Sequence, residues 1–216
     1  MTRLPMMFQD EVPTKVRERA LFVYSFFPEI HDREIRCHWS TRLETSVALW
    51  RRENSTIVLS RKGCDRATIA HELTHVCQEY IGFPSGEESC DIFMMARSDR
   101  YLDSLPCYIN RAVPEMEEHW QNNELTGEVL HALANLAIEQ RNSGNRRYIK
   151  WFKETLEGML MDDGGEWGAI AKANAKLLRM DCILVWGRLD YQGIMAQDRI
   201  LEDKSVRSII DDIELA

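Results

Sequence analysis

The sequence predicts an α+β fold that is rich in helix, with a small N-terminal sheet followed by a mainly helical C-terminal half. Two observations carry this prediction. Short segments with β-branched and aromatic residues cluster at about residues 34–60, and the longer segments after residue 65 place their apolar residues at helical spacing. A chain of 216 residues can bury a sizeable core, as one domain or as two closely joined halves.

The N-terminal part is predicted to contain one helix and then short strands. The helix is expected over about residues 13–25. The segments EIRCHWS (34–40) and SVALWRRENSTIVLS (46–60) have the composition of strands, and ENST (53–56) is a turn signal between two short strands of an antiparallel or mixed sheet.

After the segment RKGCD, the apolar spacing changes to that of a helix. Asp65 has the side chain of an N-cap, and apolar residues then recur at helical spacing until Gly82. The loop GFPSG (82–86) follows. A second helix is predicted from Ser85 to about Leu105.

The remaining chain is predicted to be helical, beyond a soft boundary near residue 110. LPCYINRAVPEMEE (105–118) is the least regular interior stretch, so we expect an N-terminal core over 1–110 and a helical half over 111–216, packed as one unit. Helical patterns cover residues 123–140, 145–161 and 166–189, and an acidic amphipathic tail follows.

Composition argues against several classes of partner. The formal charge is −8, from 27 basic and 35 acidic residues, which disfavours a nucleic-acid-binding surface. No apolar run approaches the roughly 18 residues of a membrane span, and the N-terminus lacks the apolar centre of a signal peptide. The six cysteines are spread singly, without a CxxC pair. We therefore expect a cytoplasmic protein with neither nucleic acid nor membrane as a partner.

The segment TIAHELTHVCQEY (68–80) contains the pattern of a zinc site. His71 and His75, four residues apart, lie on one helix face, about 6 Å apart along the axis, and Glu72 lies about 100° round from His71. Zinc peptidases use this arrangement, with two histidine ligands and the glutamate as general base. The alternative is a pair of solvated or core-packed histidines on a surface helix.

A catalytic zinc ion needs a third protein ligand, and the next helix offers glutamates. It opens with SGEESCD, in which Ser85 and Glu88 have the spacing of a capping box. That leaves Glu87 as the candidate ligand, with Asp91 four residues later on the same face. Asp91 can accept a hydrogen bond from the second nitrogen of a ligand histidine. The alternative for both carboxylates is solvated helix charge.

HExxH followed by ExxxD resembles the pattern of the gluzincins, and the chain looks like the small soluble minigluzincins. EESCDIFMMA is also similar to a segment of the ImmA/IrrE-type regulatory proteases. The resemblance covers about residues 35–105 and implies a zincin-like core with one Zn²⁺ per chain. It makes His71, His75 and Glu87 the metal ligands, Glu72 the general base, and Asp91 the partner of a ligand histidine. It also makes the strand near TIVLS the sheet edge that binds a peptide substrate.

The leading hypothesis is a zinc metallopeptidase that hydrolyses peptide bonds with Glu72 as general base, acting on a peptide or protein substrate. The alternative is a zinc-binding, latent or inactive regulatory module whose helical half covers the cleft. A DNA-associated protease of SprT type is disfavoured, because no third histidine follows the motif closely and no CxxC pair is present.

Several side chains near the motif have open roles. The residue that would stabilise the oxyanion is not identified, and Gln78, one turn after His75, can support a ligand or only cap a polar edge. A cysteine thiolate at the open zinc position would make the enzyme latent, although buried structural cysteines are commoner. The candidates are Tyr101, Tyr108, His119 and His131 for the oxyanion, and Cys64, Cys77 and Cys90 for the thiolate.

Overall fold

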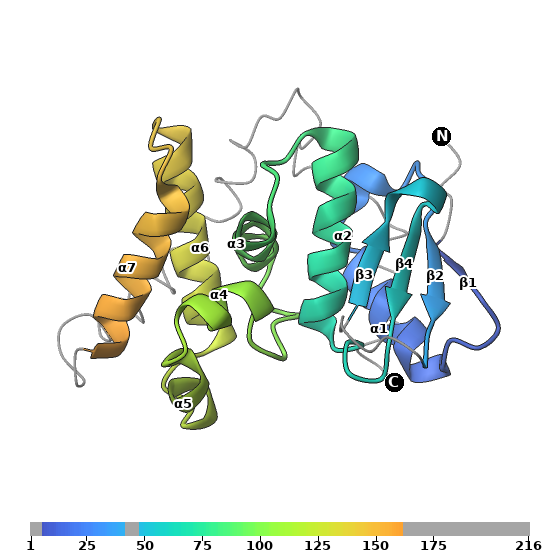
Figure 1. Ribbon diagram of the computed structural model, residues 1–216, viewed down its shortest axis with the longest axis horizontal. Helices are drawn as coiled ribbons and strands as arrows, with labels where there is room; N and C mark the ends of the chain where they lie inside the picture. The colour runs from blue at the N-terminus through green and yellow to red at the C-terminus, as the bar shows by residue number, and fades with distance from the viewer. Residues whose placement is uncertain (1–5, 42–47, 162–216) are drawn as a thin grey trace. The chain divides into compact units, whose positions relative to one another are not determined.

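The computed structural model describes residues 6–41 and 48–161, which form two units (Figure 1). The described part of the N-terminal unit ends at Ser85, and the C-terminal unit begins at Gly86. Together these residues contain one small four-stranded sheet and seven α-helices, a mixed α/β content that is mostly helical. For these residues, the predicted combination of a small N-terminal sheet with mostly helical structure is confirmed.

The division between the units comes earlier in the chain than the boundary predicted near residue 110. Helix α3 (Glu87–Arg97) packs against α6 (Gly127–Asn142) and therefore groups with the C-terminal unit. The irregular stretch that marked the predicted boundary forms two short helices, α4 (Cys107–Ala112) and α5 (Met116–Gln121). Its irregular apolar spacing reflects two six-residue helices and not a linker.

The sheet of the N-terminal unit has the strand order β1-β2-β4-β3 and is mixed (Figure 1). Strand β1 (Met7–Phe8) runs parallel to β2 (Arg36–Trp39), and β2 runs parallel to β4 (Thr56–Leu59). Strand β3 (Ala48–Arg51) pairs with β4 in the antiparallel direction, with the short 3₁₀ turn η2 between them. The sequence predicts β2, β3 and β4, but β1 has only two residues and no alternation to reveal it.

Strand β4 lies inside the sheet, which corrects the expectation that the TIVLS segment forms the edge. All four of its residues are buried, and it pairs with β2 on one side and with β3 on the other. A strand with both neighbours in place has no backbone groups left for a peptide. Within the described residues β3 pairs only with β4, so β3 is the edge strand on this side.

Two helices pack beside the sheet in the N-terminal unit. Helix α1 (Thr14–Tyr24) matches its predicted range and packs against α2 (Arg66–Ile81). The 3₁₀ turn η1 (Pro28–Ile30) also packs on α2. Helix α2 contacts β3 and β4 and lies on the β3 side of the sheet in Figure 1. The longest helix of this unit is thus held by the edge strand, the central strand and a second helix.

The described part of the C-terminal unit consists of helices, with α3, α6 and α7 (Tyr148–Met161) packed together. Helix α3 ends at Arg97, before the predicted end near Leu105, because Ser98 adopts an extended conformation with φ −165° and ψ 145°. Tyr101 is fully buried after this break, and its hydroxyl donates a hydrogen bond of 2.7 Å to the Met94 carbonyl. The predicted helix over 166–189 and the acidic tail lie outside the described residues.

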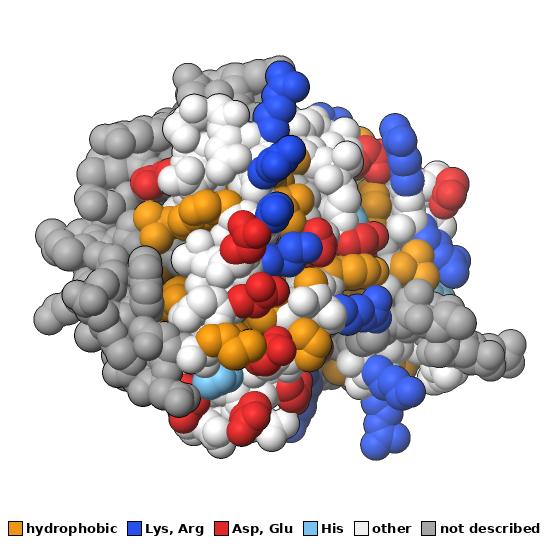
Figure 2. Space-filling view, turned by 60° about the vertical axis from the view of Figure 1, so that its left-hand side comes forward, with side chains coloured by type: hydrophobic (Ala, Val, Ile, Leu, Met, Phe, Trp, Pro, Cys, Tyr) orange, Lys and Arg blue, Asp and Glu red, His pale blue; other side chains and the backbone are white. Residues whose placement is uncertain are grey.

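The surface in Figure 2 carries basic side chains interspersed with acidic ones. In the C-terminal unit, Lys150 lies 3.4 Å from Glu154 and Lys153 lies 2.8 Å from Glu88. Among the helices that the structure describes, none combines the length and apolarity needed to span a membrane. Surface charge of the C-terminal unit is therefore partly paired within that unit.

Candidate metal centre

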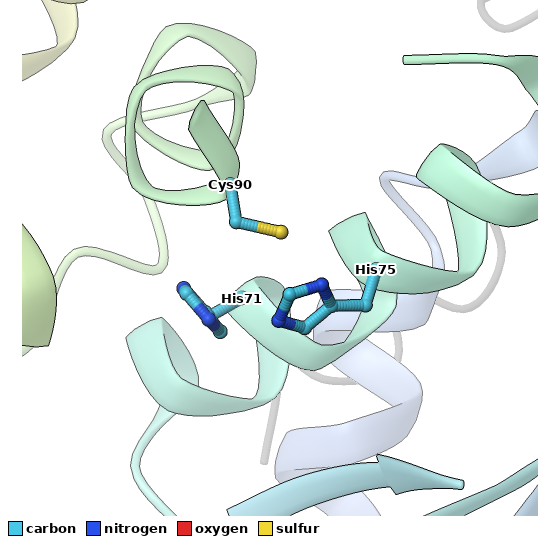
Figure 3. Close-up of side chains that lie close together, drawn as sticks. All are labelled: His71, His75 and Cys90. Atoms are coloured by element: carbon cyan, nitrogen blue, oxygen red, sulfur yellow. The ribbon is translucent and has the colours of Figure 1, made fainter. Parts of the chain in front are cut away.

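His71 and His75 lie on successive turns of α2 and present their imidazoles side by side (Figure 3). The ring centroids are 4.8 Å apart, the ring planes meet at 84°, and a ligand nitrogen of one ring lies within 4.8 Å of one in the other. His71 is 7% exposed and Glu72, the next residue, is 6% exposed. His71 is therefore not a solvated surface histidine, whereas His75 is of intermediate exposure.

This pair of imidazoles fits a metal ion. Two nitrogens bound to one tetrahedral Zn²⁺ at about 2.0–2.1 Å lie roughly 3.4 Å apart. The nitrogens of His71 and His75 are within 4.8 Å of each other, so small side-chain rotations bring them to that spacing. Neutral imidazole is also the commonest metal ligand in proteins.

The orientation of α2 follows from its ends and from its apolar residues. Asp65 caps the helix by accepting a hydrogen bond of 2.8 Å from the Thr68 amide, as predicted, and Gly82 ends it in the left-handed conformation with φ 81°. Leu73 and Val76 are fully buried and fix the rotation of the helix about its axis. The histidine pair is thus placed by a helix that is capped at its start and packed along its length.

Gln78 lies one turn after His75 and makes hydrogen bonds in two directions. Its Oε1 is 2.8 Å from Nδ1 of His75, and its Nε2 donates a hydrogen bond of 2.6 Å to the Pro84 carbonyl. The role that the sequence left open for Gln78 is therefore a contact with a candidate ligand.

The first turn of α3 differs from the predicted capping box. The N-cap residue is Gly86, with φ 104° and no side-chain cap hydrogen bond, so Ser85 lies outside the helix. Glu88 instead accepts a hydrogen bond of 2.8 Å from Lys153 of α7. The predicted capping role of Glu88 is wrong, but its carboxylate still has a structural partner, so Glu87 remains the candidate glutamate ligand.

A cysteine is a second candidate for the third ligand. Cys90 is buried and lies three residues after the exposed Glu87, so both are on one face of α3. A cysteine thiolate is also a ligand type that Zn²⁺ binds. From the sequence, Cys90 is expected only as a thiolate at the open zinc position. The three-residue spacing between Glu87 and Cys90 is the sequence feature that would indicate a ligand role.

The Asp91 carboxylate accepts hydrogen bonds from backbone amides at the start of α4. It is fully buried, and its Oδ2 accepts hydrogen bonds of 2.8 Å from the Tyr108 amide and 2.9 Å from the Ile109 amide. A carboxylate there satisfies amides that a helix N-terminus leaves without intrahelical partners. The hydrogen bond predicted from a ligand histidine to Asp91 stays a prediction.

The other candidate residues have hydrogen-bond or ring partners within their own unit. Nδ1 of His119 is 2.6 Å from a Glu124 carboxylate oxygen, and Nδ1 of His131 is 2.7 Å from the Met95 carbonyl oxygen. Tyr101 is buried against Met94, and the Arg111 guanidinium lies over the Tyr108 ring. Among the cysteines, Cys77 donates to Glu29 at 3.4 Å and Cys64 to the Arg61 carbonyl at 3.8 Å. These contacts favour structural roles, and the oxyanion residue stays unassigned.

The chain was compared with protein families, curated proteins and solved structures. No protein-family model, no curated protein and no solved structure matches the chain. A functional assignment therefore rests on the chemistry of α2 and α3.

Proposed function

We propose that the chain is a zinc-dependent metallopeptidase of gluzincin type, acting on a peptide or protein substrate in the cytoplasm. One observation carries the proposal: His71 and His75 face each other on α2 with ligand nitrogens within 4.8 Å, and the buried Glu72 lies between them in sequence. Glu87, on the first turn of α3, supplies the third ligand.

In this proposal, His71, Glu72 and His75 of α2 have different roles in hydrolysis. A bound Zn²⁺ would lower the pKa of a water molecule toward neutrality and polarise the substrate carbonyl. Glu72 accepts the proton of the attacking water and then passes it to the nitrogen of the leaving amine, so that the peptide C–N bond breaks. His71 and His75 hold the metal and take no part in the proton transfer.

The substrate binds along β3 in this proposal, since β4 is interior. An extended peptide adds to a sheet through backbone hydrogen bonds at an exposed edge. β3 is the edge strand next to α2, and Trp50 of β3 is hydrogen-bonded to Glu79 of α2. The edge strand and the helix that carries the histidines are therefore linked within one unit.

The test is peptide hydrolysis by zinc-loaded protein, with Glu72→Gln as the matched variant. Glutamine keeps the shape of Glu72 but cannot accept the proton, so we expect zinc to stay bound and the rate to fall on the order of 10² to 10⁴. A variant that hydrolyses as fast as the unaltered protein would show that Glu72 is not the base.

The alternative function is a zinc-binding, latent or inactive regulatory module, and Cys90 favours it. Its thiol is buried and lies on the same face of α3 as Glu87, and a thiolate is a ligand type that Zn²⁺ binds. A thiolate ligand beside His71, His75 and Glu87 would fill the position that the attacking water needs. We then expect Cys90→Ala to keep zinc and to switch on hydrolysis, with Cys107→Ala, at an exposed thiol, as the control. Unchanged hydrolysis in Cys90→Ala would contradict latency by this thiol.

A further inference from the structure

Gln78 joins the His75 imidazole to the loop that follows α2. One end of its side-chain amide lies 2.8 Å from Nδ1 of His75, and the other donates a hydrogen bond of 2.6 Å to the Pro84 carbonyl oxygen. All three residues belong to the N-terminal unit. The chain of hydrogen bonds therefore lies wholly within one part of the structure.

The partner at the loop fixes which way the amide points. A backbone carbonyl oxygen only accepts hydrogen bonds, so the Gln78 group that faces Pro84 must be the amide NH₂. The amide carbonyl oxygen then faces His75, and it too only accepts. The His75 Nδ1 atom at 2.8 Å must therefore carry the proton of this hydrogen bond.

A neutral imidazole with its proton on Nδ1 has its lone pair on Nε2. We propose that Gln78 is a positioning residue, which holds His75 in the Nδ1–H tautomer and presents Nε2 as the ligand atom. This inference rests on the proposed function for its purpose, since a metal-binding histidine commonly donates its second N–H to an oxygen that fixes the ring. The tautomer itself does not depend on a metal being bound.

The loop after α2 has a restricted backbone conformation at the residues around the Gln78 hydrogen bond. Gly82 has φ 81°, a conformation that suits glycine, and the Phe83 side chain is only 6% exposed. Pro84 follows with its restricted φ, and its carbonyl oxygen accepts the Gln78 hydrogen bond. Glu87 begins α3 only three residues later. Gln78 thus connects one candidate ligand to the segment that leads to the next.

Two-bond ¹H–¹⁵N correlation spectra of the metal-free protein test the tautomer directly. The pH is chosen so that imidazole is neutral, and His75→Ala identifies the His75 signals. We expect Nδ1 of His75 to carry the proton, although unconstrained neutral imidazole favours a proton on Nε2. A His75 signal of the Nε2–H form in the unaltered protein would overturn the proposal.

Two variants separate orientation from general stability. Gln78→Leu removes both hydrogen bonds at similar volume, and we expect it to lose the Nδ1–H preference. Gln78→Glu keeps an acceptor for His75 but removes the donor to Pro84, and we expect it to retain the tautomer. Backbone spectra confirm that both variants are folded. If both variants keep the tautomer of the unaltered protein, Gln78 does not set it.

Zinc titration then separates this inference from the proposed function. Loss of such a partner typically weakens metal binding by about 10- to 100-fold, which is the expected effect of Gln78→Leu, while Gln78→Glu stays close to the unaltered protein. Equal zinc affinity in all three proteins would overturn the positioning role. An Nδ1–H His75 in a protein that binds no zinc would confirm the hydrogen-bond chain and refute the metal centre.

Discussion

The indole Nε1 of Trp50 donates a hydrogen bond of 2.9 Å to Oε2 of Glu79, which ties the edge strand β3 to the helix α2. The other carboxylate oxygen of Glu79 lies 3.0 Å from Nε of Arg52. One side chain of α2 therefore holds both Trp50 of β3 and Arg52 of the turn η2 that follows.

Removing this carboxylate should loosen the edge strand. We expect Glu79→Ala to lower the free energy of unfolding by about 1–2 kcal/mol, because the Trp50 donor loses its partner. Urea denaturation measures the change. Arg52→Ala is the control: its side chain is 78% exposed, so losing the ion pair should cost at most about 1 kcal/mol. Equal effects in the two variants would show that the Trp50 hydrogen bond is not the main contribution.

Zinc should stabilise the protein if the candidate centre binds it. At a free zinc concentration 100 times the dissociation constant, binding adds about 2.7 kcal/mol to the stability of the folded state. We expect the melting temperature to rise with zinc and to fall back when a chelator is added. A His71→Ala, His75→Ala double variant serves as the control and should not respond. A rise of the same size in that variant would place the bound zinc elsewhere.

The adjacent glutamates of α3 should differ in their effect on zinc. We expect Glu87→Gln to weaken zinc binding severely, since it removes a charged ligand. Glu88→Gln should keep the metal and cost at most about 1 kcal/mol of stability, because its pair with Lys153 is partly exposed. Zinc affinity of both variants checks the assignment. Loss of zinc in Glu88→Gln, with binding intact in Glu87→Gln, would shift the ligand by one residue.

Asp91 should matter for folding whether or not metal is present. Asp91→Ala leaves the buried Ile109 amide and its neighbour, the Tyr108 amide, without their acceptor, so we expect a loss of about 1–3 kcal/mol per unsatisfied group. Denaturation of metal-free protein measures this. A variant that is fully stable without zinc but binds zinc weakly would instead favour the role predicted for Asp91 beside a ligand histidine.

Stability should fall in alkali because of Cys37. Burial raises the pKa of the Cys37 thiol from 9.0 to about 12, while the nearby Arg17 opposes this shift. Between these two values the unfolded chain loses the proton and the folded chain keeps it, so the stabilisation present below pH 9 is lost as the pH rises toward 12. Denaturation against pH should show a shallower decline in Cys37→Ala. Identical slopes would exclude this thiol as the cause.

The parts of the fold that the sequence predicts are those with local signals. Asp65 and Gly82 mark the two ends of α2 because capping chemistry depends on neighbouring residues. The i, i+4 spacing likewise places His71 and His75 together, because helix geometry alone sets that distance. These features need no knowledge of the rest of the chain.

The parts that the sequence misses depend on partners far away in the chain. Ser85 and Glu88 have the right spacing for a capping box, but Gly86 turns the chain one residue later and Lys153 provides the partner of Glu88. Asp91 reads as solvated charge or as a partner for histidine, and its acceptor role appears only when α4 is in place. The interior position of β4 likewise follows from pairing with β2, which no local pattern encodes.

The strand order also bears on how the chain folds. Arg51 pairs with Thr56, five residues away, whereas Arg36 pairs with Thr56 across twenty residues and Met7 with Arg36 across twenty-nine. Closing a short loop loses less chain entropy than closing a long one, so the β3–β4 hairpin is the least demanding pairing of the sheet. Helix α2 starts only seven residues after β4 ends. The histidine-bearing helix therefore follows, in the chain, the strand pairing that costs the least chain entropy to close, whereas the parallel pairings require longer loops.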